Sequence, residues 1–166
     1  MDILESNLNR AIHLLKTPEN YEDYISIKIK PVHGGCCCFH CWSKTWSRIN
    51  MYIAPCGPLR DEGAVLIEKN YEKFVLECHE SGPEIIVYLG VGVATLTLVK
   101  SIVDLITTML KTLQTEPTKA SGKLKITKRC LIKGHVETED LLEIELPLSD
   151  EVIKIMNEKI EMILKR

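Results

Sequence analysis

The segment HGGCCCFHCW, residues 33–42, holds the residue types best suited to chemistry, with four of the chain's seven cysteines and two of its five histidines. Thiolate and imidazole are ligands of Zn²⁺, which takes four of them, usually as pairs spaced by two to four residues. Cys38 and Cys41 form one such pair. Cys36 and Cys38 would face the same side of an extended segment, because adjacent side chains there point in opposite directions. A zinc site is therefore one interpretation.

A complete zinc site needs ligands from elsewhere in the chain, because no second short pair of this kind exists. The six candidate metal ligands are Cys36, Cys38, Cys41, Cys56, Cys78 and His79. Free cysteine is also among the most buried residue types, so thiols that only pack are the main alternative. Redox or acylation chemistry of the thiols is a third interpretation.

The sequence offers no convergent set of catalytic residues. It contains no G-x-S-x-G, P-loop or G-x-G-x-x-G motif. Cys78 and His79 are adjacent, and on a strand their side chains would diverge, which disfavours a nucleophile–base pair. We therefore expect a protein that is not an enzyme.

Length and composition are those of one globular domain, 1–166, with 45% hydrophobic and 27% charged residues. A net charge of −2 gives no reason to expect nucleic acid as a partner. The first residues, MDILESNLNR, lack the apolar region of a secretory signal. We expect a cytoplasmic protein with reduced thiols.

Several elements that would position these residues follow from local periodicity. Residues 2–16 have the apolar spacing of a short amphipathic helix, and YISIKIKPV, from residue 24, alternates like a half-buried strand. SRINMYIAPC alternates through Ile49, Met51 and Ile53, which predicts a second strand. These two strands would form a hairpin with a cysteine-rich tip at 33–45. GAVLIEK (63–69) and KFVLECHE (73–80) predict two more strands.

The segment SGPE, residues 81–84, has the Ser-x-x-Glu spacing of a capping box, with Pro83 in the first helical turn. It predicts a long helix from about 82 to 114. The first half, 85–99, carries no charge, whereas the second half is amphipathic from Lys100 onward.

The uncharged half of this predicted helix has three interpretations. It is buried at the centre of the domain, or it associates with a partner, or it enters a membrane. Small and apolar residues would form the helix–helix seam of an oligomer: Gly90, Val91, Val93, Ala94 and Leu96. A membrane span needs about 20 apolar residues, so an anchor through 85–110 would have to include Lys100 and is not favoured.

The remainder, 123–166, predicts a hairpin and a helix. A basic strand, LKITKRCLIKG, precedes an acidic one, VETEDLLEIELP, and opposite charges across paired strands are mildly stabilising. Ser149 would cap a helix through Ile163. Together these elements predict an α+β fold: a largely antiparallel sheet packed around one long central helix, with short N- and C-terminal helices.

Three functions remain open on the sequence alone. The leading hypothesis is a non-enzymatic interaction or regulatory protein that forms a homo-oligomer or docks on a larger protein partner. The second is a small zinc-binding protein that uses the thiols of 33–41. The third is a membrane-associated component anchored through 85–110.

Overall fold

A computed structural model describes residues 3–90, 92, 94–116 and 123–165. Within them the elements follow in the order α1 (Ile3–Leu15), η1 (Tyr21–Asp23), β1 (Tyr24–Pro31), α2 (Ser43–Tyr52), η2 (Ala54–Cys56), β2 (Ala64–Lys69), β3 (Glu72–Glu77), β4 (Glu84–Tyr88), α3 (Leu96–Leu113), β5 (Lys123–Ile132), β6 (His135–Glu145) and α4 (Asp150–Leu164). The strands form one sheet in the order β2-β3-β4-β1-β5-β6. Every neighbouring pair is antiparallel. The predicted α+β fold with a largely antiparallel sheet is confirmed.

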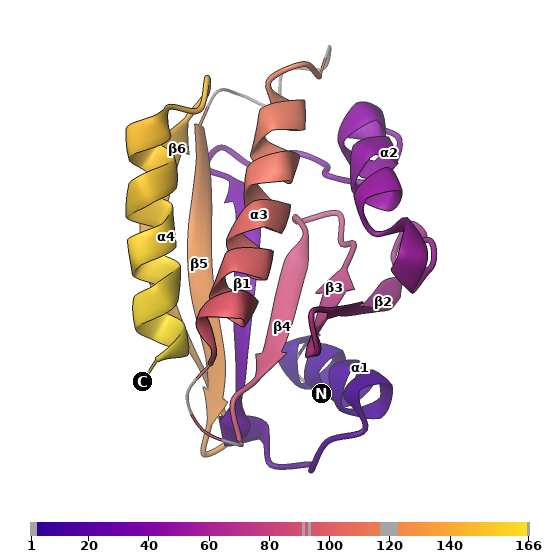
Figure 1. The fold of residues 1–166 in the computed structure, drawn as a ribbon, viewed down its shortest axis with the longest axis vertical. Coiled ribbons are helices and arrows are strands. Elements are labelled where there is room, and N and C mark those ends of the chain that lie inside the picture. The colour runs from indigo at the N-terminus through magenta and orange to yellow at the C-terminus, as the bar shows by residue number, and fades with distance from the viewer. Residues whose placement is uncertain (1–2, 91, 93, 117–122, 166) are drawn as a thin grey trace.

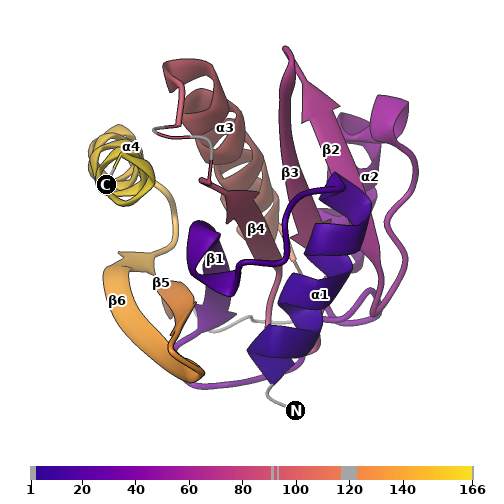
Figure 2. The same cartoon turned by 90° about the horizontal axis from the view of Figure 1, so that it is seen from below.

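Helices cover both faces of this sheet. Figure 1 shows α3 and α4 in front of the sheet, and Figure 2 shows α1 on the opposite face. Each face has its own apolar core. The larger core joins the sheet to α2, α3 and α4, and the smaller core joins it to the apolar side of α1, where Leu4, Leu8 and Ala11 are buried.

The central strand β1 is buried on both faces. The alternation of its sequence predicted a half-buried strand, and that expectation was wrong because α1 covers the second face. Ile25, Ile27 and Ile29 enter the larger core. Ser26 and Lys28, on the side of α1, are also buried.

The predicted long helix 82–114 was wrong in its first half. Residues Glu84–Tyr88 form strand β4, and α3 begins only at Leu96, where the Thr95 side chain accepts a hydrogen bond from the Leu98 N–H. The sequence of a strand that is covered on both faces is a continuous apolar run, and so is the sequence of a buried helix. The pattern alone therefore does not distinguish the two. The expected capping-box residue Glu84 instead pairs with Lys28 on β1 and Glu77 on β3.

The predicted strand after the cysteine segment was also wrong. Residues Ser43–Tyr52 form helix α2, and the neighbours of β1 in the sheet are β4 and β5, so the hairpin with a tip at 33–45 is not formed. The buried residues follow a helical spacing: Trp42, Trp46, Ile49 and Ile53. Met51, which the alternation placed on the buried side, is 69% exposed.

The two terminal helices and the C-terminal hairpin were predicted correctly. Helix α4 begins with the Ser149 hydroxyl accepting a hydrogen bond from the Val152 N–H. Strands β5 and β6 pair along their length, with Lys125 Nζ 3.6 Å from Asp140 Oδ2. Local signals, namely apolar spacing, an N-cap and complementary charge, were sufficient for these elements.

Candidate functional site

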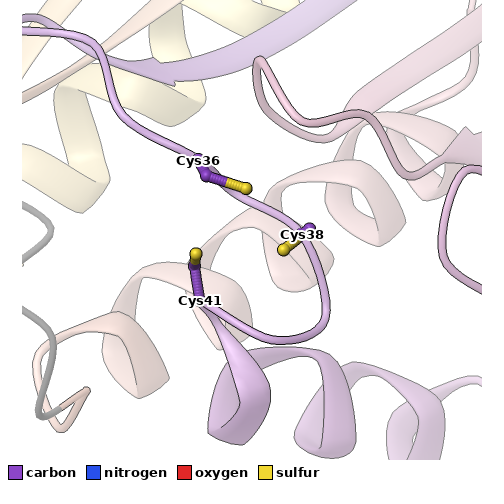
Figure 3. A group of neighbouring side chains, drawn as sticks. All are labelled: Cys36, Cys38 and Cys41. Atoms are coloured by element: carbon purple, nitrogen blue, oxygen red, sulfur yellow. The ribbon is translucent and has the colours of Figure 1, made fainter.

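The loop between β1 and α2 brings three of the predicted metal ligands together. The Sγ atoms of Cys36, Cys38 and Cys41 all lie within 4.8 Å of one another. Figure 3 shows the three side chains converging on the inside of the turn that precedes α2. Cys36 is exposed, and the other two thiols are half-buried. This group, called the thiol loop below, is open to solvent.

The backbone of the thiol loop is fixed from behind by buried groups. Trp46 is fully buried, and its Nε1–H donates to the Cys37 carbonyl oxygen at 2.7 Å. The Phe39 ring stacks on the Trp46 indole with centroids 5.1 Å apart. The Cys37 N–H donates to the Glu80 carbonyl at 2.8 Å. These contacts hold the turn in place before any ligand binds.

Cys37 itself does not belong to the group of converging thiols. It is buried in the larger core, and burial raises the pKa of its thiol to about 12. A neutral buried thiol is a packing residue, because the thiolate is the form that binds metal or acts as nucleophile. Of the three consecutive cysteines, the middle one therefore packs and the outer two face the loop interior.

Hydrogen bonds among the three thiols favour one thiolate at Cys38. The pKa of Cys38 is lowered, first by a hydrogen bond from the Cys36 side chain and next by the Cys41 backbone. The pKa of Cys41 is raised to about 12, first through its side-chain hydrogen bonds to Cys36 and to Cys38. The arrangement can therefore present a sulfur anion at Cys38 beside two further thiols, and a metal ion that binds all three sulfurs would displace the protons of the other two into solvent.

The other three predicted ligands have different partners. Cys56 Sγ donates to the Glu68 carbonyl oxygen at 3.5 Å. Burial raises the pKa of Cys78 to about 12, and its thiol donates to Asp61 Oδ1 at 3.6 Å. His79 contacts two carboxylates on the other face of the sheet. The structure does not bring these three into the group formed by Cys36, Cys38 and Cys41.

The predicted interaction residues do not form a helical seam. Gly90 and Ala94 lie before the start of α3, so their four-residue spacing is not a helical one. Leu96 is the first residue of α3 and is 66% exposed. Val91 and Val93 lie outside the described residues. The predicted anchor 85–110 is divided between β4 and α3, and no helix in the described part of the chain has the length and apolar character to cross a membrane.

A charged cluster that no local sequence pattern predicted lies beneath α1. Glu77 and Glu84 are fully buried and lie opposite each other on β3 and β4. Arg10 Nη2 lies 2.7 Å from Glu77 Oε1, and the Arg129 guanidinium contacts Glu84 Oε2. His79 Nε2 lies 3.2 Å from Glu77 Oε1 and 3.5 Å from Glu84 Oε1. Arginines from α1 and β5 thus neutralise the two carboxylates.

Glu84 has more hydrogen-bond and ion-pair partners than Glu77. The Asn7 amide donates to Oε1 at 2.7 Å and the Ser26 hydroxyl to Oε2 at 2.5 Å. Burial alone would raise the pKa of Glu84, but His79, Arg129 and Ser26 together hold it at about 2. Burial likewise would lower the pKa of His79, whereas the two carboxylates beside its Nε2 raise it above the usual value. The cluster is a set of mutually compensated charges.

The fold and these two groups define an α+β protein with an exposed thiol loop on one side and a buried charged cluster under its N-terminal helix. No family model matches the sequence. Comparisons with curated proteins and with solved structures likewise found no significant match. The function of the protein must therefore be inferred from the geometry of these two groups.

Proposed function

We propose that the protein binds a thiophilic divalent metal ion, Zn²⁺ above all, through Cys36, Cys38 and Cys41. The observation that carries this proposal is the mutual approach of three sulfur atoms within 4.8 Å. Tetrahedral zinc with Zn–S bonds of about 2.3 Å requires sulfurs roughly 3.8 Å apart. The sulfurs would therefore close by about 1 Å at most, which a loop with exposed side chains can accommodate.

The ligand type also favours this class of metal. Thiolate ligands are soft and select Zn²⁺, Cu⁺ or iron–sulfur centres over Mg²⁺ and Ca²⁺. Three protein ligands leave one tetrahedral position for water or for a ligand from outside the chain. Because Cys36 is exposed, that fourth position would face solvent, so the metal could join the protein to another molecule.

Metal titration tests the proposal. Reduced, metal-free protein titrated with Co²⁺ should develop thiolate-to-cobalt charge-transfer absorption that saturates at one ion per chain, and Zn²⁺ should displace it. Native mass spectrometry should then show one zinc. The double variant Cys38→Ser/Cys41→Ser should lose the ion, because two of three ligands are gone.

Cys56→Ser is the matched control, since Cys56 was a predicted ligand and its thiol bonds to the Glu68 carbonyl. This variant should bind metal as the unchanged protein does. Failure of the reduced protein to bind either ion, or equal binding by the double variant, would reject the proposal. A Cys38–Cys41 disulfide that forms readily in air and leaves no metal bound would favour redox chemistry instead.

Self-association is a second candidate function, supported by one surface feature. Leu96 is 66% exposed and borders a groove of about 560 Å³ between α3 and α4. Val99, Val103 and Ile153 contribute apolar surface to its lining, and charged side chains of both helices make up most of the remainder. Large exposed apolar side chains beside a groove are typical of interaction surfaces. The occupant we propose is a second copy of the chain, whose own Leu96 would enter the groove as the two-fold contact of a dimer requires.

Light scattering coupled to size-exclusion chromatography tests this contact. The unchanged protein should form a dimer at micromolar concentration, and Leu96→Glu should convert it to a monomer because a carboxylate would be buried in the contact. Met51→Glu is the control, because Met51 is equally exposed on α2, away from the groove. A monomer at every concentration would dispose of this candidate.

A further inference from the structure

A row of polar side chains crosses four strands on the face covered by α1. Strand register places Glu77 opposite Glu84, Glu84 opposite Lys28, and Lys28 opposite Thr127. Directly opposed residues point to the same face of a sheet. All four are buried. The row lies at the end of the face where Asn7 and Arg10 of α1 contact it through the two glutamates.

Charge within this row is compensated except at Lys28. Glu77 has Arg10 and Glu84 has Arg129 as ion-pair partners. Lys28 is only 7% exposed, and its side chain reaches solvent through the cavity that it lines; within the described residues no hydrogen bond or ion pair joins its ammonium to another side chain. Burial lowers the pKa of Lys28, an effect that the charge of Glu84 only partly offsets. A lysine that is mostly removed from water without a counter-ion on the protein is uncommon, because desolvation of its charge is costly.

Other polar atoms of the same cluster also lack partners. Within the described chain, the buried atoms without a hydrogen bond include Glu77 Oε2, Thr127 Oγ1 and Arg129 Nε. Buried polar groups are nearly always hydrogen-bonded, so these atoms show that the polar row is not fully satisfied by the described residues, although none of the three residues lines the cavity described next. Two of these three atoms, the Arg129 N–H and the Thr127 hydroxyl, are able to donate.

An open cavity of about 620 Å³ adjoins the row. Lys28, His79 and Arg10 line it, together with Ser6 and Asn7 of α1. The exposed residues Glu62 and Glu80 lie at its rim. A volume of this size is within the range of small-molecule sites. Three side chains that carry or can carry positive charge therefore face a space large enough for a metabolite.

We propose that this cavity binds a small molecule through an anionic group, a carboxylate or a phosphate, held by Lys28 with Arg10 and His79 beside it. The anion supplies the partner that the Lys28 ammonium lacks among the described residues. Charge-assisted hydrogen bonds of this kind are roughly twice as strong as neutral ones. The acidic rim disfavours polyanions, so the ligand carries a single anionic group at one end.

A metal ion is the competing occupant, because ligand atoms of Glu77, His79 and Glu84 lie within 4.8 Å of one another. Both carboxylates already bind guanidinium groups. A divalent cation would have to displace Arg10 and Arg129 and would lie near the Lys28 ammonium. Like charges at such separations repel strongly in a low-dielectric site, so an anion fits this cavity better than a cation.

Thermal unfolding in the presence of acetate or inorganic phosphate tests the proposal, with ionic strength held constant by sodium chloride. A ligand that binds only the folded protein raises the Tm in a saturable manner. We expect a rise of several degrees with at least one of the two anions, and isothermal titration calorimetry should give one site per chain. A response to acetate alone identifies a carboxylate ligand, and a response to phosphate alone identifies a phosphate group.

Lys28→Met should abolish this response, and Lys30→Met is its control, since Lys30 lies on the same strand and does not line the cavity. Without anion, the Lys28→Met variant should still fold, and its Tm should lie about 2–4 °C above that of the unchanged protein. The reason is that methionine has a similar volume and removes a mostly buried charge that has no partner on the protein. The proposal is overturned if neither anion acts beyond the effect of sodium chloride, or if Lys28→Met responds as the unchanged protein does. A lower Tm for Lys28→Met would also overturn it.

A separate experiment tests whether a metal ion occupies the cluster instead. The experiment is repeated with Mn²⁺ and Zn²⁺ on the Cys38→Ser/Cys41→Ser protein, which lacks the thiol site. Stabilisation by either ion that Glu77→Gln abolishes would assign the cluster to a cation and reject the anion site.

Discussion

Replacing Glu84 by glutamine should lower the free energy of unfolding by about 3–5 kcal/mol at neutral pH, the usual cost of removing one member of a buried ion pair. Glu84 is fully buried and is the common partner of Arg129, His79, Asn7 and Ser26. A neutral amide leaves the Arg129 guanidinium without its counter-charge in the interior. Urea denaturation followed by circular dichroism measures the change.

Glu143→Gln is the matched control, because Glu143 is a largely exposed residue of β6 with only a distant contact, 3.9 Å, to Lys123. Exposed pairs contribute little, so this variant should differ from the unchanged protein by less than about 0.5 kcal/mol. If both glutamine variants have the same stability, the carboxylate of Glu84 is not held by the network described here.

The effect of Glu84→Gln should also depend on pH in one direction. The pKa of Glu84 is about 2 in the folded protein against an ordinary value of 4.5. A depressed carboxyl pKa stabilises the fold above the unfolded-state value, and the stabilisation is lost as pH falls from 4.5 toward 2. A displacement from 4.5 to about 2 corresponds to about 3 kcal/mol. The gap between the two proteins should therefore be widest above pH 4.5 and should narrow in acid.

Trp46→Ala should destabilise the protein by about 3–5 kcal/mol, as large-to-small replacements of buried aromatic residues do. Trp46 is fully buried in the larger core, and its indole N–H binds the Cys37 carbonyl while its ring stacks on Phe39. The alanine variant leaves a void and removes the contacts that fix the thiol loop. Its affinity for Co²⁺ should fall as well, measured under conditions where it remains folded.

Trp46→Phe separates the two effects of this residue. Phenylalanine retains most of the buried ring but cannot donate to the Cys37 carbonyl. A lost hydrogen bond to a buried carbonyl costs about 1–3 kcal/mol, so this variant should lie between the unchanged protein and Trp46→Ala in stability. Unaltered metal affinity in Trp46→Ala would mean that the thiol loop is ordered independently of the core.

The two proposed sites make opposite use of burial. The thiol loop is exposed and depends on a buried scaffold behind it, so its ligands can move toward a metal ion without disturbing the core. The cavity under α1 instead contains a charge that the fold itself leaves unpaired. Many binding sites lower the stability of the free protein in this way, because polar groups that are already paired within the protein cannot also bind a ligand.

The sequence predicted the local features of the structure. The terminal helices followed from apolar spacing, and the C-terminal hairpin followed from complementary charge on its two strands. The convergence of Cys36, Cys38 and Cys41 also belongs here, since six consecutive residues are close in space in almost any turn. Cys37 was placed apart from its neighbours by the alternation of side chains, and the structure buries it.

Two errors came from patterns that have more than one structural meaning. The uncharged run from Ile85 is compatible with a buried helix and with a strand covered on both sides. The pairing of β4 with β1 and β3 makes its first part a strand. Ile49, Met51 and Ile53 alternate as on a strand, yet the burial of Trp42, Trp46 and Ile49 follows a helix. In both places the packing partner selects the structure.

Local sequence patterns were therefore enough to predict the convergence of Cys36, Cys38 and Cys41, the terminal helices and the C-terminal hairpin. The charged cluster and the cavity beside Lys28 become visible only in the folded chain. Asn7 and Glu84, which share a hydrogen bond, are 77 positions apart in the sequence. The alternation of β1 predicted that Ser26 and Lys28 would lie on the solvated face of a half-buried strand. The physical reason is that α1 covers this face, and burial turns charges that water would have solvated into groups that need partners.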